Sequence, residues 1–159
     1  MELAKTFNRK RDQIIHFLIH GIAPLSTVFS KPKVFPFSLK ELDMMPSGTL
    51  GKETAVTLKE NKYQLIPSYE MHDFKHVLLN YPMTGIGEIR MQFFALGNGN
   101  RFLTTWGIIG IGMTLFPHKI GLFLQEYRRG KRSQNITHWK FEHLVQLNII
   151  YLRSILNGK

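Results

Sequence analysis

Four residues of the kinds that bind metal ions lie close together in the segment MHDFKHVLLNYPMTGIGEIRMQ, residues 71–92. His72, Asp73 and His76 precede a proline-containing turn, and Glu88 follows it. Imidazole nitrogens and carboxylate oxygens are ligands that suit zinc and, almost as well, manganese, iron or cobalt. The segment therefore predicts a divalent-metal site, with zinc as the first expectation.

A helix over residues 69–81 would bring three of these side chains to one side. At 100° per residue, His72 and His76 lie one turn apart, and Asp73 falls within the same arc of about 100°. Position 82, a proline, is the midpoint between positions 76 and 88. A helical hairpin that turns there would place Glu88 opposite His76 at matched depth.

The neighbours of these residues have weaker predicted roles. Gln92 would oppose His72 across the hairpin, where it could hydrogen-bond a metal-binding histidine. Arg90 could pair with a carboxylate of the substrate, although a position facing solvent is more common for such a residue. Gly85 and Gly87 are expected to let the two helices approach closely.

Other arrangements of chemically active residues fit less well. Zinc peptidases carry HExxH with glutamate as the general base, and this chain has Asp73 at that place. His-Asp phosphohydrolases need a later aspartate, and none follows Asp73. Asp12, His16 and His20 recur every four residues, but they lack a facing carboxylate, and their apolar neighbours predict ordinary helix packing.

Helical patterns run along the chain, and no segment alternates as a strand would. Ser38 and Glu41 form a capping box, Ser68 is expected to cap the helix of the site, and Gly130 is expected to end a helix before a basic loop over 128–135. The expected helices cover roughly residues 8–20, 38–45, 49–60, 69–81, 84–96, 102–116, 118–129 and 137–157. The sequence thus predicts an all-α fold, a single-domain helical bundle over residues 1–159 whose metal site lies between two helices joined by a Pro/Gly turn, with the first 35 residues peripheral.

Charge and composition narrow the class of partner. The formal charge is +10, from 21 Lys and Arg against 11 Asp and Glu, and no nucleic-acid-binding motif accompanies it. We therefore expect an anionic membrane surface as a partner, and no nucleic acid. The chain has no cysteine, which excludes disulfides, thiol nucleophiles, cysteine-bound zinc and iron–sulfur clusters.

Residues 102–116 carry no charge, but they are fewer than the roughly 20 that a membrane-spanning helix needs. They predict a buried core helix or a segment that dips into one leaflet. Gly107, Gly110 and Gly112 could let an apolar chain lie close to the backbone of this helix, although such spacing more often serves close helix packing. Exposed apolar surface would indicate either a homodimer or a membrane face.

The spacing His72-Asp73-x-x-His76, then eleven residues and Glu88, resembles the signature of the coenzyme Q biosynthesis protein 4 family. The resemblance extends over roughly residues 40–155. It also includes PSGTLG at 46–51, GEIRMQFF at 87–94, the apolar segment 102–116, and YRRGKRSQN at 127–135 with the following Trp139.

This resemblance implies an all-helical protein, attached peripherally to the membrane where ubiquinone is made, that binds a divalent metal through His72, Asp73, His76 and Glu88. The family is associated with removing the ring carboxyl of a polyprenylated hydroxybenzoate and oxygenating that ring carbon, and with organising other quinone-biosynthesis proteins. Because the chain shows no mitochondrial presequence, we expect a short bacterial relative at the cytoplasmic face of the inner membrane.

Two functions remain open at this point. The first is a metal-dependent decarboxylase, a lyase of quinone biosynthesis, in which the four motif residues are catalytic. The second is a non-catalytic scaffold that binds a prenyl lipid and carries a structural metal. Four protein ligands would favour a closed structural site, whereas three ligands and an open position would favour catalysis.

Overall fold

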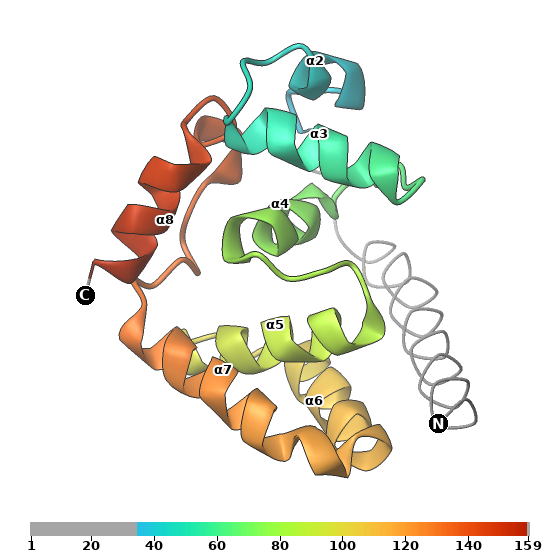
Figure 1. Ribbon diagram of the computed structural model, residues 1–159, viewed down its shortest axis with the longest axis vertical. Helices are drawn as coiled ribbons and strands as arrows, with labels where there is room; N and C mark the ends of the chain where they lie inside the picture. The colour runs from blue at the N-terminus through green and yellow to red at the C-terminus, as the bar shows by residue number, and fades with distance from the viewer. Residues whose placement is uncertain (1–34, 159) are drawn as a thin grey trace.

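The computed structural model describes residues 35–158 and is built from α-helices (Figure 1). In chain order the elements are α2 (Leu39–Asp43), α3 (Leu50–Glu60), α4 (Glu70–Leu79), α5 (Gly85–Gly97), α6 (Leu103–Leu115), the 3-10 helix η1 (Pro117–Lys119), α7 (Ile120–Arg132), the 3-10 helix η2 (Phe141–His143) and α8 (Ile149–Asn157). Residues 35–158 contain no strand, only an isolated bridge between Thr49 and Asn148. The all-α prediction is confirmed. The helix expected over 8–20, with Asp12, His16 and His20, lies outside the described residues.

Two hydrophobic clusters form the core, and a third joins them. The first lies among α2, α3, α4, η2 and α8, and the second among α5, α6 and α7 (Figure 1). The joining cluster consists of Leu79, Tyr81, Met91, Phe94, Ile136 and Leu156. The turn between α4 and α5 therefore carries the chain from the first cluster to the second, and side chains of these two helices meet where the clusters adjoin.

The turn from α4 to α5 is defined by caps at both helix ends. Asn80 adopts a left-handed conformation, with φ of 60°, and its N–H donates to the carbonyls of His76 and Val77. Thr84 caps α5 by accepting the Gly87 N–H. A Cβ atom on Gly87 would lie 1.9 Å from the carbonyl oxygen of Pro82. Gly87 is therefore required by the turn itself, which differs from the expected role in helix–helix approach.

The predicted helix starts are partly right. The capping box is confirmed, because the Ser38 hydroxyl accepts the Glu41 N–H and the Glu41 carboxylate accepts the Ser38 N–H. Ser68 does not cap α4, so that prediction is wrong. Its φ of 67° places it in a left-handed turn, and α4 instead follows Tyr69, whose side chain makes no capping hydrogen bond.

The expected end of α7 is also wrong. The helix passes through Gly130 and continues to Arg132, so the basic stretch expected as a loop begins inside it. A Cβ atom on Gly130 would lie 2.1 Å from the Phe94 carbonyl oxygen, and one on Gly97 would lie 2.1 Å from that of Tyr127. These glycines let α5 and α7 cross with their backbones in contact, so Gly130 serves packing and does not end the helix.

The last helix begins later than residue 137. Asn148 caps it by accepting the N–H groups of Ile150 and Tyr151, and α8 follows from Ile149. Turns and η2 occupy most of the preceding segment, where buried Phe141 and Val145 belong to the first cluster. An apolar pattern typical of a helix is here produced by a folded loop that packs against the core.

The α6 helix is only partly a core helix. Its buried residues are Thr105, Ile109 and Gly112, and the rest of its surface is open or half-buried. Among the described helices, none alone is long and apolar enough to cross a membrane. The segments Leu103–Leu115 and Pro117–Arg132 meet that test only as a pair, and they bend by 105° at the break between them.

Two arginines cap the C-terminal end of α4. Arg153 of α8 donates to the carbonyls of Val77 and Leu78 at 2.8 and 3.1 Å, and Arg129 of α7 donates to that of Leu79 at 3.0 Å. Cationic donors at this end of a helix offset its partial negative charge. The contacts also fix α7 and α8 relative to the helix that carries the two histidines.

We expect Gly130→Ala to destabilise the fold by about 1–3 kcal/mol, because the added methyl group would push the α5 and α7 backbones apart. Gly121→Ala is the matched control on the same helix, since no atom lies within 4 Å of its added Cβ. The control should be neutral or slightly stabilising. Urea unfolding of both variants provides the measurement, and equal free energies of unfolding would contradict the close crossing.

Arg153→Met should lower the free energy of unfolding by about 1–3 kcal/mol, because two α4 carbonyls would lose charged donors. Arg128→Met removes an exposed arginine of α7 and should change it by less than about 0.5 kcal/mol. Thermal and urea unfolding can compare the two variants. A similar small effect in both would show that the α4 cap contributes nothing measurable.

Candidate metal centre

The ring of His76 is oriented by the turn that follows α4. It lies on the last turn of α4, is 1% exposed, and its Nδ1–H donates to the carbonyl of Tyr81 at 3.3 Å. A carbonyl oxygen can only accept, so Nδ1 carries a proton, and in the neutral ring the lone pair is on Nε2. The turn after α4 thus orients the ring and selects its tautomer.

His72 lies one turn earlier on the same helix. Its ring stacks on the ring of Tyr69 with 4.4 Å between centroids and an interplanar angle of 24°. Its Nε2 atom lies 3.1 Å from Nε2 of His76. Stacking on a half-buried tyrosine at the start of α4 restricts the rotation of the imidazole and directs Nε2 toward the neighbouring histidine.

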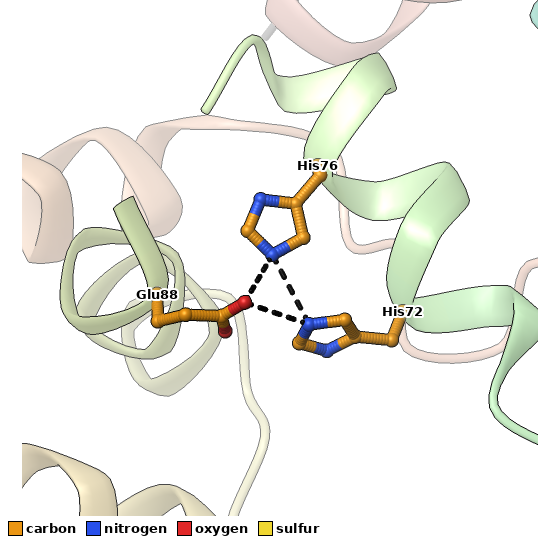
Figure 2. Close-up of side chains that lie close together, drawn as sticks. All are labelled: His72, His76 and Glu88. Carbon is orange, nitrogen blue, oxygen red and sulfur yellow. Dashed lines mark hydrogen bonds and ion pairs between the residues drawn. The ribbon is translucent and has the colours of Figure 1, made fainter. Parts of the chain in front are cut away.

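Glu88 completes the group from the first turn of α5, as Figure 2 shows. Its Oε1 atom lies 2.7 Å from Nε2 of His76 and 3.0 Å from Nε2 of His72. These three atoms form a nearly equilateral triangle. His76 and Glu88 therefore face each other across the turn, as their spacing in the sequence predicts.

Burial and mutual charge set the protonation of this group. Burial lowers the pKa of His72 below its usual value. Burial also acts to lower the pKa of His76, but the hydrogen bond and charge of Glu88 raise it above the usual value. For Glu88 burial acts to raise the pKa, and the two histidines together hold it far below its usual range.

The three donors fit a divalent cation. Ligands about 2.0–2.1 Å from a tetrahedral zinc ion stand about 3.3 Å apart, so the three atoms would need to separate by only a few tenths of an ångström. The carboxylate of Glu88 would also offset part of a 2+ charge. Among the described residues, Glu88 Oε2 is the one buried side-chain polar atom without a hydrogen-bond partner. Such an unpartnered atom is expected where a metal or its ligand would bind.

The structure places the other candidate residues outside this triangle. Asp73 is buried beside it, but it is not part of the group whose ligand atoms lie within 4.8 Å of one another. Burial is the main cause that raises the pKa of Asp73 to about 7. Gln92 accepts a hydrogen bond from Thr105 of α6, and Arg90 binds Glu126 of α7. Of the proposed ligands, His72, His76 and Glu88 converge.

Two partners of the histidines were not expected from the sequence. The hydrogen-bond acceptor for His76 is the backbone carbonyl of Tyr81, which takes the role expected of an outer side chain such as Gln92. Tyr69 supports His72. A backbone acceptor leaves no residue-type signal in a sequence, whereas Tyr69 at i−3 from a histidine on a helix could have been found by its spacing.

Comparison with known proteins identifies a solved structure that shares the fold of this chain. No protein-family model matches the chain, and no curated protein matches it. It resembles the crystal structure of a Nostoc punctiforme PCC 73102 protein named, provisionally, as a ubiquinone biosynthesis protein. The two chains are 24% identical and superpose with a TM-score of 0.63, over 91% of this chain and 80% of the other. At this identity the likeness establishes the shared all-helical fold, and the resemblance to the coenzyme Q biosynthesis protein 4 family stays a prediction.

We expect the purified protein to bind about one equivalent of zinc, and His76→Ala and Glu88→Gln to weaken this binding by about 100-fold or more. Asp73→Asn should retain the metal, because its carboxylate lies outside the converging group. Titration calorimetry and elemental analysis after desalting provide the measurement, with manganese, iron and cobalt as competitors. Equal loss in Asp73→Asn would make it a fourth ligand, and full binding by Glu88→Gln would exclude this site.

Proposed function

We propose that this protein acts in ubiquinone biosynthesis as a divalent-metal-dependent decarboxylase of a polyprenylated hydroxybenzoate-type precursor. The observation that carries the proposal is the convergence of His72, His76 and Glu88 on one buried point between α4 and α5. The fold shared with the Nostoc protein supports the pathway, and the three-membered ligand group supports catalysis.

The number of ligands favours an enzyme over a scaffold. A structural zinc site is usually closed by four protein ligands, whereas a catalytic one keeps a position open for substrate or water. Three side chains converge here, and Asp73 stands apart from them. His72 is partly accessible, with 11% of its side chain exposed, while His76 and Glu88 are almost fully enclosed. This difference in exposure supports entry of a substrate from the His72 side.

A divalent metal, when bound, would act as a Lewis acid toward the carboxylate or phenolate of the substrate. Loss of the carboxyl breaks the bond between the ring carbon and the carboxyl carbon and leaves the electron pair on the ring. Carbon dioxide leaves as this bond breaks, and a proton from solvent then takes the vacated position. Oxygenation of the same carbon would need dioxygen or another oxidant as a second reactant.

The side chains of this chain prepare that step. The Tyr81 carbonyl holds a proton on Nδ1 of His76, so in the neutral ring the lone pair of Nε2 faces the site. The unpartnered Oε2 of Glu88 can accept a hydrogen bond from the substrate's hydroxyl group. Burial around His76 and Glu88 excludes water, which strengthens the interaction of the site with charge that develops on the ring.

The proposal also defines a place and partners. A polyprenyl tail partitions into the bilayer, so the protein would act as a peripheral protein at the cytoplasmic face of a bacterial inner membrane, beside other quinone-biosynthesis proteins. The formal charge of +10 supports attraction to anionic lipid. The second candidate, a prenyl-lipid-binding scaffold, shares this location and differs in having no turnover.

We expect the metal-loaded protein to release carbon dioxide from a prenylated 4-hydroxybenzoate dispersed in detergent, with mass spectrometry of the product as the measurement. His76→Ala and Glu88→Gln should lower turnover by about 100-fold or more, because each removes a group that holds the metal. Arg128→Met, on the surface of α7, is the control and should retain turnover.

The outcomes separate the two candidates. Binding of the substrate analogue without turnover, under air and with metal present, would favour the scaffold. Turnover that survives in Glu88→Gln would place the chemistry elsewhere in the protein. Absence of both binding and turnover would refute the assignment to this substrate class.

A further inference from the structure

The α6 helix exposes large apolar side chains to solvent. Leu103 is 85% exposed, Trp106 49% and Met113 47%, and Phe102, just before the helix, is 69% exposed. A Cβ atom on Gly107 or Gly110 would meet no atom within 4 Å, so the surface between these side chains is open. Soluble surfaces rarely gather large apolar side chains in this way without a partner.

These residues share one face of the helix. At 100° per residue, Leu103, Trp106, Gly107, Gly110 and Met113 fall within an arc of about 120°. The same arc includes Thr114, whose hydroxyl donates to the Gly110 carbonyl at 2.9 Å. The one polar side chain of the arc is therefore satisfied within the helix, which lowers the free energy needed to move it into an apolar medium.

The charges around this face are almost all positive. Arg101 and Lys119 stand at the two ends of α6, which itself has no charged residue. Within residues 101–132 the one acidic residue is Glu126, and it is buried and bonded to Tyr81 and Arg90. An apolar face bracketed by cations, with no exposed carboxylate in the segment, complements a bilayer with anionic headgroups.

We propose that the exposed face of α6, with Phe102 before it, inserts into one leaflet of an anionic membrane. The 13 residues of α6 span about 20 Å, so the helix is shorter than the hydrocarbon core of a bilayer. The 105° bend at Pro117 turns the chain back along α7. In this position Trp106 lies at the level of the headgroups, where tryptophan is favoured, and Arg101 and Lys119 contact lipid phosphates.

The inserted helix is attached directly to the candidate metal centre. The inner side of α6 packs Gly112 against Ile89, the residue after Glu88, and a Cβ atom on Gly112 would lie 2.6 Å from the Ile89 side chain. Thr105 also donates to Gln92 of α5 at 3.1 Å. The membrane-facing element and a ligand-bearing helix therefore form one unit (Figure 1). The inference itself depends on α6 and not on metal chemistry.

Flotation of the full chain with vesicles of phosphatidylcholine and phosphatidylglycerol in equal parts tests this proposal. We expect Leu103→Asp to weaken vesicle binding by about tenfold or more, since an apolar side chain is lost and a charge is added. Ile150→Asp is the matched control. It lies in the first turn of α8, is 72% exposed, and should bind as the natural chain does. An aspartate in the first turn is favourable in both helices, so both variants should fold.

Fluorescence gives an independent measurement. The chain has two tryptophans, and insertion should shift the emission of Trp106 to shorter wavelength when vesicles are added. The shift should disappear in Trp106→Phe while vesicle binding remains. Glu88→Gln should bind vesicles normally, so a failure of the metal site would not be confused with a failure of the membrane face.

Three results would overturn the proposal. The first is equal binding of Leu103→Asp and the natural chain, which would reduce the contact to electrostatic adsorption. The second is a change from dimer to monomer in Leu103→Asp, seen by analytical ultracentrifugation with vesicle binding unchanged, which would assign the face to a second copy of the chain. The third is the absence of vesicle binding by the natural chain.

Discussion

A buried carboxylate that faces two imidazoles is the interaction on which this structure depends. An isolated charge at the position of Glu88 would cost several kcal/mol, and the rings of His72 and His76 offset that cost only if all three groups hold their positions. One oxygen of Glu88 nevertheless stays without a partner among the described residues. The group is therefore incomplete as a set of interactions among the described residues.

The rest of the fold fixes the two helices that supply these groups. Arg129 and Arg153 bind the carbonyl end of α4, close to His76, and hold it against α7 and α8. On the other side, α5 cannot shift along α7, because their backbones touch at Gly97 and Gly130. The hydrophobic clusters on either side of the site thus hold α4 and α5 in place separately, and a short turn joins these two helices. The side chains of His76 and Glu88 come from these two helices and meet at hydrogen-bond distance.

The sequence was informative where the signal was local. Periodicity placed His72 and His76 on one face, and the proline at the midpoint placed Glu88 opposite them, because spacing within a helical turn depends on few other residues. Prediction from the sequence failed where contacts between distant parts of the chain determine the role of a residue. Gly130 has the sequence features of a helix end, yet it is a crossing point with α5. Asp73 falls in the right arc of the helix, but where its carboxyl group points depends on packing that spacing cannot give.

The position of α6 gives a physical reason for combining a metal site with an exposed apolar helix. A polyprenylated ring is held in the bilayer by its tail, so a site in the protein interior can reach it only from a surface that meets the lipid. Here α6 packs directly on the residue after Glu88, because Ile89 lies against Gly112. Glycine at position 112 lets α6 lie close to α5, and a larger residue there would move these two helices apart. Gly112 thereby keeps the exposed helix next to the helix that carries Glu88, as the proposed chemistry requires.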